Sequence, residues 1–153
     1  MKRFAFRFQS VAKVRKIEME RQARVLAEAL MRVRQIEEEI ESIKGLNRRE
    51  VHRLQDLASK GQIPSQMMEL SVMYREELKR EHKRKMILLR EAEAKVREER
   101  EKLIEREKAR KVMEKVKERD FENYVEEKRK EENKQIDELA HRFASGSAGH
   151  SES

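Results

Sequence analysis

The sequence predicts an all-α fold, a long antiparallel two-helix coiled coil (a helical hairpin) with an overhanging C-terminal helix. Charged residues make up 45% of the 153 residues and apolar residues 37%, a balance that is typical of long helices and coiled coils. Strong helix formers dominate and charges of both signs alternate, which argues against disorder. Apolar residues also recur at steps of three and four, as on one face of a helix.

The first helix is predicted over residues about 5–60. Lys44–Asn47, which contains Gly45, is a weak point that we interpret as a tolerated kink, with a true break as the alternative. The apolar stripe consists of Phe8, Ala12, Met19, Ala23, Leu26, Leu30, Val33, Ile36, Ile40, Ile43, Val51, Leu54 and Ala58.

A turn is predicted at 61–64, because Gly61 can end one helix and Pro64 is tolerated where the next begins. The second helix is predicted over about 65–143, which gives one hairpin domain at 1–143 and a flexible tail at 144–153. Its stripe consists of Met67, Leu70, Tyr74, Leu78, Met86, Leu89, Ala92, Val96, Leu103, Val112, Val116, Ile136, Leu139 and Phe143.

The turn fixes a register in which residues equally far from position 62 face each other. Two charged clusters that were not used to place the turn agree with this register, since opposite charges that flank a seam select its alignment. The acidic cluster is Glu37, Glu38, Glu39 and Glu41, and the basic cluster opposite it is Lys83, Arg84 and Lys85.

The same register brings most of the aromatic residues to one end of the hairpin. Phe4 and Phe8 are expected opposite Phe121 and Val116, with Tyr124 one turn further on. Burial of these rings would close an end whose seam is otherwise thin.

Beyond about residue 124, the second helix has no partner within the chain in this register. We expect it to expose an apolar stripe there, formed by Ile136, Leu139, Ala140 and Phe143. An alternative is that the charged segment 95–118 is a lone helix stabilised by its own ion pairs, so that the hairpin is paired only near the turn.

The sequence indicates no enzyme, no cofactor and no metal site. It has no cysteine, no phosphate-binding glycine loop, and four histidines far apart at positions 52, 82, 141 and 150. No apolar run approaches the length of a membrane span, so we expect a soluble intracellular protein.

Residues 1–16 carry six positive charges and no negative charge. This end could dock on an acidic partner, or it could be neutralised across the hairpin by Glu118, Asp120 and Glu122. No element that reads nucleic acid is recognisable, so no specific nucleic-acid partner is expected.

Two terminal motifs resemble a known family. The N-terminal motif consists of Phe4, Phe6, Arg7, Phe8, Gln9, Val11, Arg15, Glu18 and Leu26–Ala29, and the C-terminal motif of Glu132, Lys134, Asp137, Glu138, Ala140 and Arg142. Together with the chain length and the single turn, they are similar to the FliJ family of flagellar type III export.

The resemblance implies a stalk-like coiled coil at the cytoplasmic face of the inner-membrane export apparatus, bound to the membrane through partners only. It implies three partners, namely a hexameric export ATPase, the cytoplasmic domain of the export gate and export chaperones. The gate contact would involve Tyr74 and Leu78, although Glu81 and Lys85 on that face depart from the pattern and both candidates could be ordinary seam residues. The residues implied in ATPase binding are Phe4, Arg7, Phe8, Lys13, Asp137, Glu138, Arg142 and Phe143.

Two alternatives share this architecture. One is a stalk protein of a non-flagellar type III injectisome, although the N-terminal motif favours the flagellar form. The other is a generic basic coiled coil that acts as a spacer or coats nucleic acid.

Overall fold

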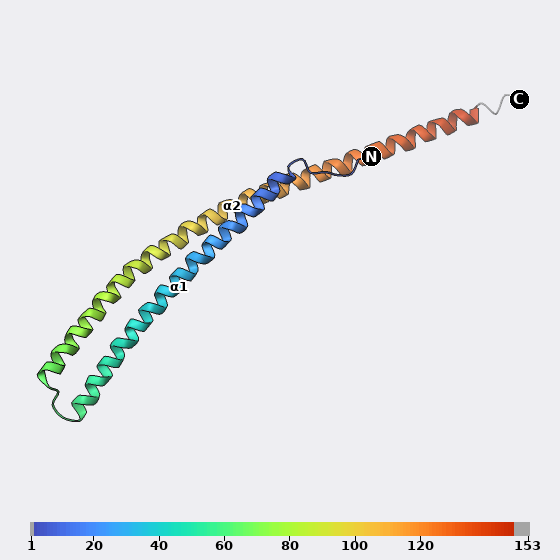
Figure 1. Cartoon of the computed structure of the whole chain (residues 1–153). Helices are drawn as coiled ribbons and strands as arrows, with labels where there is room; N and C mark the ends of the chain where they lie inside the picture. The colour runs from blue at the N-terminus through green and yellow to red at the C-terminus, as the bar shows by residue number, and fades with distance from the viewer. Residues whose placement is uncertain (1, 149–153) are drawn as a thin grey trace. The chain divides into compact units, whose positions relative to one another are not determined.

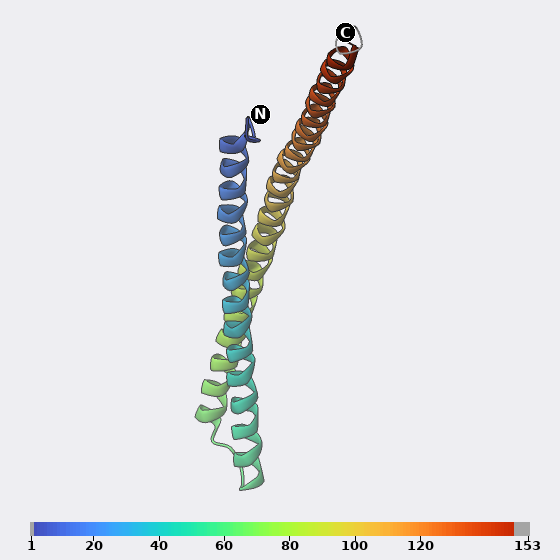
Figure 2. The same cartoon turned by 90° about the vertical axis from the view of Figure 1, so that its right-hand side faces the viewer.

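The computed structural model describes residues 2–148 and contains two α-helices, α1 (Gln9–Ser59) and α2 (Ser65–Ala148) (Figure 1). Helix α1 has 51 residues and α2 has 84, and no strand occurs in the described part of the chain. The helices pack against each other in opposite directions, which confirms the helical hairpin (Figure 2).

Helix α1 begins at Gln9, four residues later than predicted. The carbonyl oxygen of Lys2 accepts a hydrogen bond of 2.9 Å from the hydroxyl of Tyr124, and Gln9 N–H donates to the Phe6 carbonyl. The backbone before Gln9 is therefore held against α2 in an irregular path. Helix α1 then runs through Gly45 without a break, so the alternative of a true break at Lys44–Asn47 was wrong.

The turn lies where the sequence placed it. Gly61 has a φ of 145°, which side chains with a Cβ rarely adopt, and this conformation ends α1. The carbonyl of Pro64 accepts the first bond of α2, from Met68 N–H at 3.1 Å. Since proline has no N–H to leave unpaired, it is suited to this start.

Helix α2 extends to Ala148, so it includes the first five residues of the predicted tail. The hydroxyls of Ser145 and Ser147 each donate at 3.0 Å to the carbonyl three residues earlier, and the backbone here is helical. The rest of the predicted tail, residues 149–153, lies outside the described residues.

The packing contacts group the chain into two units, where the sequence predicted one domain. The first, here called the turn unit, is Met19–Glu105. The second, the terminal unit, comprises the described residues of Met1–Glu18 and Arg106–Ser153.

The turn unit has an apolar seam with the predicted register. Ile36 and Ile40 of α1 and Leu78 and Val96 of α2 are buried in it. Of the two charged clusters, Glu39 and Lys85 meet across the seam at 2.8 Å, while Glu41 and Arg84 pair within their own helices.

The predicted stripe was wrong at three positions of α1, since Ala23, Leu30 and Ala58 are exposed, and at three positions of α2. Leu70, Tyr74 and Val112 are exposed, and Ser71 is fully buried instead. A coiled-coil seam repeats every seven residues, and Ser71 lies one repeat before the buried Leu78. The Ser71 hydroxyl can be buried because it donates a hydrogen bond of 2.7 Å to the carboxylate of Glu50.

The terminal unit begins with the expected aromatic cluster. The ring of Phe4 lies 5.2 Å from that of Phe121, edge to face, and 5.4 Å from that of Tyr124. Phe8 was predicted in the seam, but it is 38% exposed and Phe6 is the buried ring, with 9% exposed. The residues before Gln9 are not helical, so helical spacing does not determine which of them face α2.

After Val96, α2 first packs against α1 and then continues without a neighbouring helix among the described residues. Glu99 bonds Gln22 within the turn unit and Arg106 bonds Glu18 within the terminal unit, so the alternative of a lone helix over 95–118 was wrong. Residues 125–147, here called the arm, are all exposed. Figure 1 shows that α1 does not extend beside this end of α2. The predicted overhang is therefore confirmed.

Candidate protein-binding surfaces

The surface offers little for small-molecule chemistry. Among residues 2–148, no group of three or more histidine, aspartate and glutamate side chains is placed to hold a metal ion. In the same part of the chain, neither helix contains a stretch apolar enough to cross a bilayer.

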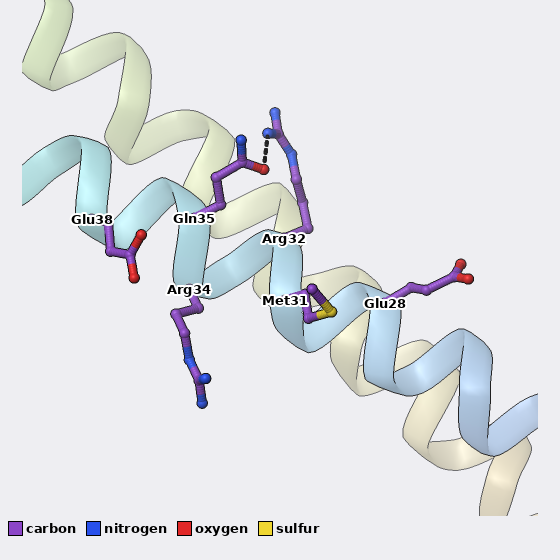
Figure 3. Close-up of a pocket in the computed structure, with 6 residues that line it drawn as sticks. All are labelled: Glu28, Met31, Arg32, Arg34, Gln35 and Glu38. Carbon is purple, nitrogen blue, oxygen red and sulfur yellow. Dashed lines mark hydrogen bonds between the residues drawn. The ribbon is translucent and has the colours of Figure 1, made fainter.

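One hollow lies on the outer face of α1 in the turn unit (Figure 3). Its lining residues all come from a single helix, and Figure 3 shows Glu28, Arg34 and Glu38 pointing outward in different directions. The only bond drawn there joins Arg32 to Gln35, at 3.2 Å. A hollow with one wall cannot enclose a ligand, so we assign it no role.

The N-terminal segment presents basic side chains to solvent. Arg3, Arg7 and Lys13 are exposed, and the Arg7 guanidinium lies 5.5 Å from the centre of the Phe8 ring. In the described part of the chain, no ion pair within 4 Å joins residues 2–16 to Glu118, Asp120 or Glu122. Asp120 nevertheless lines one hollow with Arg3 and Arg7, so neutralisation across the hairpin stays a prediction beside docking on an acidic partner.

A groove continues this basic surface between the two helices of the terminal unit. Lys13 and Lys16 of α1 and Arg110 and Lys117 of α2 line it, with Met113 also in its lining. Glu114 lines the groove as well, but it is paired with Arg110 at 2.8 Å. The groove is therefore electropositive.

The arm carries the other four residues implied in ATPase binding. Asp137, Glu138 and Arg142 line one shallow surface with Lys134 and His141. Phe143 is 80% exposed, an unusual state for a phenylalanine. Ile136 and Leu139 on the same part of α2 are exposed as well, and an exposed group of apolar side chains is typical of a protein-binding surface.

The eight predicted ATPase-binding residues form two groups within the terminal unit. Phe4 lies beside Phe121 and Tyr124, whereas Asp137 is about 20 Å further along α2 at 1.5 Å per residue. Of the N-terminal four, Phe4 belongs to the aromatic cluster, Arg7 lies over the Phe8 ring, and Lys13 lines a groove between α1 and α2. The C-terminal four lie on the arm.

The two predicted gate residues differ in environment. Leu78 is buried in the seam with 9% exposed, which agrees with its interpretation as a seam residue, whereas Tyr74 is exposed. Leu70 and Met73 lie within four residues of Tyr74 on α2 and are also exposed. These three residues, here called the turn patch, include two that sequence reasoning missed, although their spacing was visible.

The turn unit also contains a buried polar contact that the apolar pattern of the sequence does not reveal. Gln22 Nε2 donates to the carboxylate of Glu99 at 2.5 Å and to its backbone carbonyl at 3.0 Å. Lys95 and Lys102 approach the same carboxylate at 3.1 and 3.2 Å. The hydrogen bond from Gln22 and those from the two lysines lower the pKa of Glu99 to about 2, so the buried side chain is charged.

Comparison with known proteins gives one result. The family model of the flagellar FliJ protein matches residues 4–149, almost the whole chain. The chain belongs to the FliJ family. It is thus a flagellar export-associated protein, and the family is a non-catalytic component of export. No curated protein and no solved structure matched the chain.

Proposed function

We propose that this FliJ-family chain is the stalk of the flagellar export ATPase, a coiled coil that binds the hexameric enzyme and stimulates or assembles it. The observation that carries the proposal is the arm, a regular helix with an exposed apolar stripe and no partner helix among the described residues. We also propose that it works at the cytoplasmic face of the inner-membrane export apparatus, contacts the export gate and escorts export chaperones.

The chemistry of the arm supports binding inside a ring of subunits. Ile136, Leu139 and Phe143 are exposed and spaced by three and four residues, so they share one face. Charged side chains, including Asp137 and Arg142, lie between them. Apolar anchors within a charged rim are the usual composition of a protein interface.

The N-terminal group supports the same partner. Arg7 and Lys13 are exposed, and the electropositive groove beside them suits acidic side chains of the ATPase. Neither group supplies a catalytic residue. Stimulation would come from tighter binding to the assembled or competent conformation of the hexamer, which raises its population.

The experiment measures ATP turnover and hexamer formation of a flagellar export ATPase with the wild-type chain and with Leu139→Ser/Phe143→Ser. Burial of a large apolar side chain contributes about 1.5–3 kcal/mol, so we expect binding to weaken about tenfold or more and stimulation to be lost at matched concentrations. Truncation after Asn133 should abolish the effect.

The matched control is Leu30→Ser/Met31→Ser, which removes two exposed apolar side chains from α1 in the turn unit. It should stimulate like the wild type. Equal stimulation by the arm variant and the wild type would contradict the proposal. If the chain instead binds duplex DNA with steep salt dependence and has no effect on the ATPase, the generic basic coiled coil would replace it.

For the gate, we propose the turn patch of Leu70, Met73 and Tyr74 as the contact surface. Leu78, which the resemblance also implies, would act indirectly, because its side chain is packed in the seam and holds this stretch of α2 in place. An exposed apolar group of this size is suited to a small hydrophobic pocket on a partner.

A further inference from the structure

The Gln22–Glu99 contact occupies a position where a coiled coil normally has apolar side chains. Glu99 is 3% exposed and lies three residues after the buried Val96, so it belongs to the seam of the turn unit. Fully buried glutamates are rare unless they are paired.

The contact is specific as well as buried. The amide of Gln22 bonds both the side-chain carboxylate and the backbone carbonyl of Glu99, so it fixes that residue at two points. Lys95 and Lys102 lie on the same helix as Glu99, one turn before it and one turn after it. Their ammonium groups pair with the Glu99 carboxylate. Among these partners, Gln22 alone lies on α1.

Burying such a group costs desolvation, and apolar residues at the same positions are often as stabilising. A buried polar contact is better explained by the alternative alignments of the two helices that it excludes. Leucine, isoleucine, valine, methionine and alanine in a seam are largely interchangeable, so an apolar hairpin tolerates sliding by one seven-residue repeat.

Sliding of this kind would break the Gln22–Glu99 contact in either direction. One direction places Glu99 opposite Ala29, which follows Gln22 by one repeat. The other places Gln22 opposite Ala92, which precedes Glu99 by one repeat. Each shifted alignment leaves one buried polar group facing a methyl group, and an unpaired buried polar group is costly.

We propose that the Gln22–Glu99 contact is a register lock, which selects one alignment of the two helices in the turn unit. The competing explanation is that the turn alone sets the alignment, with help from polar contacts closer to it, Glu50–Ser71 and Asn47–Arg75. The two explanations differ in what happens when the lock is replaced by apolar residues.

The experiment uses the absence of native cysteine. Met31→Cys on α1 and Ile104→Cys on α2 are exposed positions for two spin labels in the full chain. Ile104 lies several turns beyond the residue opposite Met31, so sliding changes the distance between the labels. Pulsed electron spin resonance then gives the distribution of distances between the labels. One repeat of sliding displaces the helices by about 10 Å along their axes, and this shortens or lengthens the distance between the offset labels, a change that the measurement resolves.

With Gln22 and Glu99 in place, we expect a single population of distances between the two spin labels. With Gln22→Leu/Glu99→Leu, we expect a chain that is as helical as the wild type but has a second distance population from the slid alignment. The swap Gln22→Glu/Glu99→Gln retains a side-chain donor and acceptor and should restore the single distance.

The matched control is Gln35→Leu/Glu98→Leu, the same replacements at exposed positions of the same helices. It should keep one distance. A single unchanged distance in Gln22→Leu/Glu99→Leu would overturn the register lock in favour of the turn. Loss of helicity in that variant would also overturn it, because the contact would then be needed for folding itself.

Discussion

At the scale of single residues, this hairpin depends on a few polar side chains placed in an apolar seam. Glu99 is the most buried of its carboxylates, and Ser71 is buried beside Glu50. Both are satisfied by partners on the other helix, which is the condition under which polar groups are tolerated inside proteins.

Glu99 should make stability depend on pH in acid solution. Gln22, Lys95 and Lys102 lower the pKa of this carboxyl from 4.5 to about 2, so the folded state binds its proton less readily than the unfolded state. Its stabilising contribution is complete above about pH 4.5 and is lost as the pH falls towards 2. Urea unfolding followed by circular dichroism across this range should show the decline.

The control for this titration is Glu99→Gln, which cannot titrate. It should be less stable than the wild type at neutral pH, and the difference should shrink as the pH falls below 4.5. A difference that does not change with pH would mean that the carboxylate charge contributes nothing.

At the scale of the element, α1 continues through a glycine that its structure does not require. A Cβ at Gly45 would meet only the Arg48 side chain, at 3.9 Å, an ordinary contact. Gly45→Ala should therefore stabilise the protein by about 0.5–1 kcal/mol, because alanine loses less backbone entropy in a helix. Urea unfolding measures the change.

Gly61→Ala is the contrasting variant. A Cβ added at this position would have no atom within 4 Å, but the φ of 145° is unfavourable for alanine. This variant should lose stability although it causes no clash. If the two glycines responded alike, the positive φ would not be what matters at the turn.

The sequence predicted the two helices, the turn and the register because a single glycine–proline stop in a long amphipathic pattern leaves few alternatives. It misplaced Leu70 and Tyr74 because leucine and tyrosine were counted as seam residues ahead of Ser71. Apolar spacing cannot reveal a serine that is buried by its hydrogen bond to Glu50.

The functional surfaces were predictable to different degrees. The exposure of the arm followed from the predicted helix lengths, since in the predicted register the first helix reaches only to about residue 124 of the second. Phe6 could not be distinguished from Phe8, because residues 2–6 are not in a regular element with a fixed period. The Gln22–Glu99 contact joins residues far apart in the chain, and it emerges only when the register is known at the level of single side chains.

At the scale of the whole molecule, the proposed ATPase and gate surfaces belong to different packing units. The turn patch lies in the turn unit and the arm in the terminal unit. We therefore expect Met73→Ser/Tyr74→Ala to weaken binding to the gate's cytoplasmic domain about tenfold or more while ATPase stimulation is unchanged. Calorimetric titration of the gate domain and ATP turnover measure the two effects.

The arm variant Leu139→Ser/Phe143→Ser should show the opposite pattern, with gate binding retained and ATPase stimulation lost. The two variants are each other's control. If either one removed both activities, the assignment of separate surfaces would be wrong.

The exposed arm is already a regular helix, supported by pairs such as Glu126 with Lys130 at 3.2 Å and not by a neighbouring helix. A partner would thus meet a rigid ligand, and capture would need no coil-to-helix transition of the arm. Because the arm is helical before it binds, its backbone loses little conformational entropy on binding. The rate of complex formation would then depend on collision frequency and on attraction between charges.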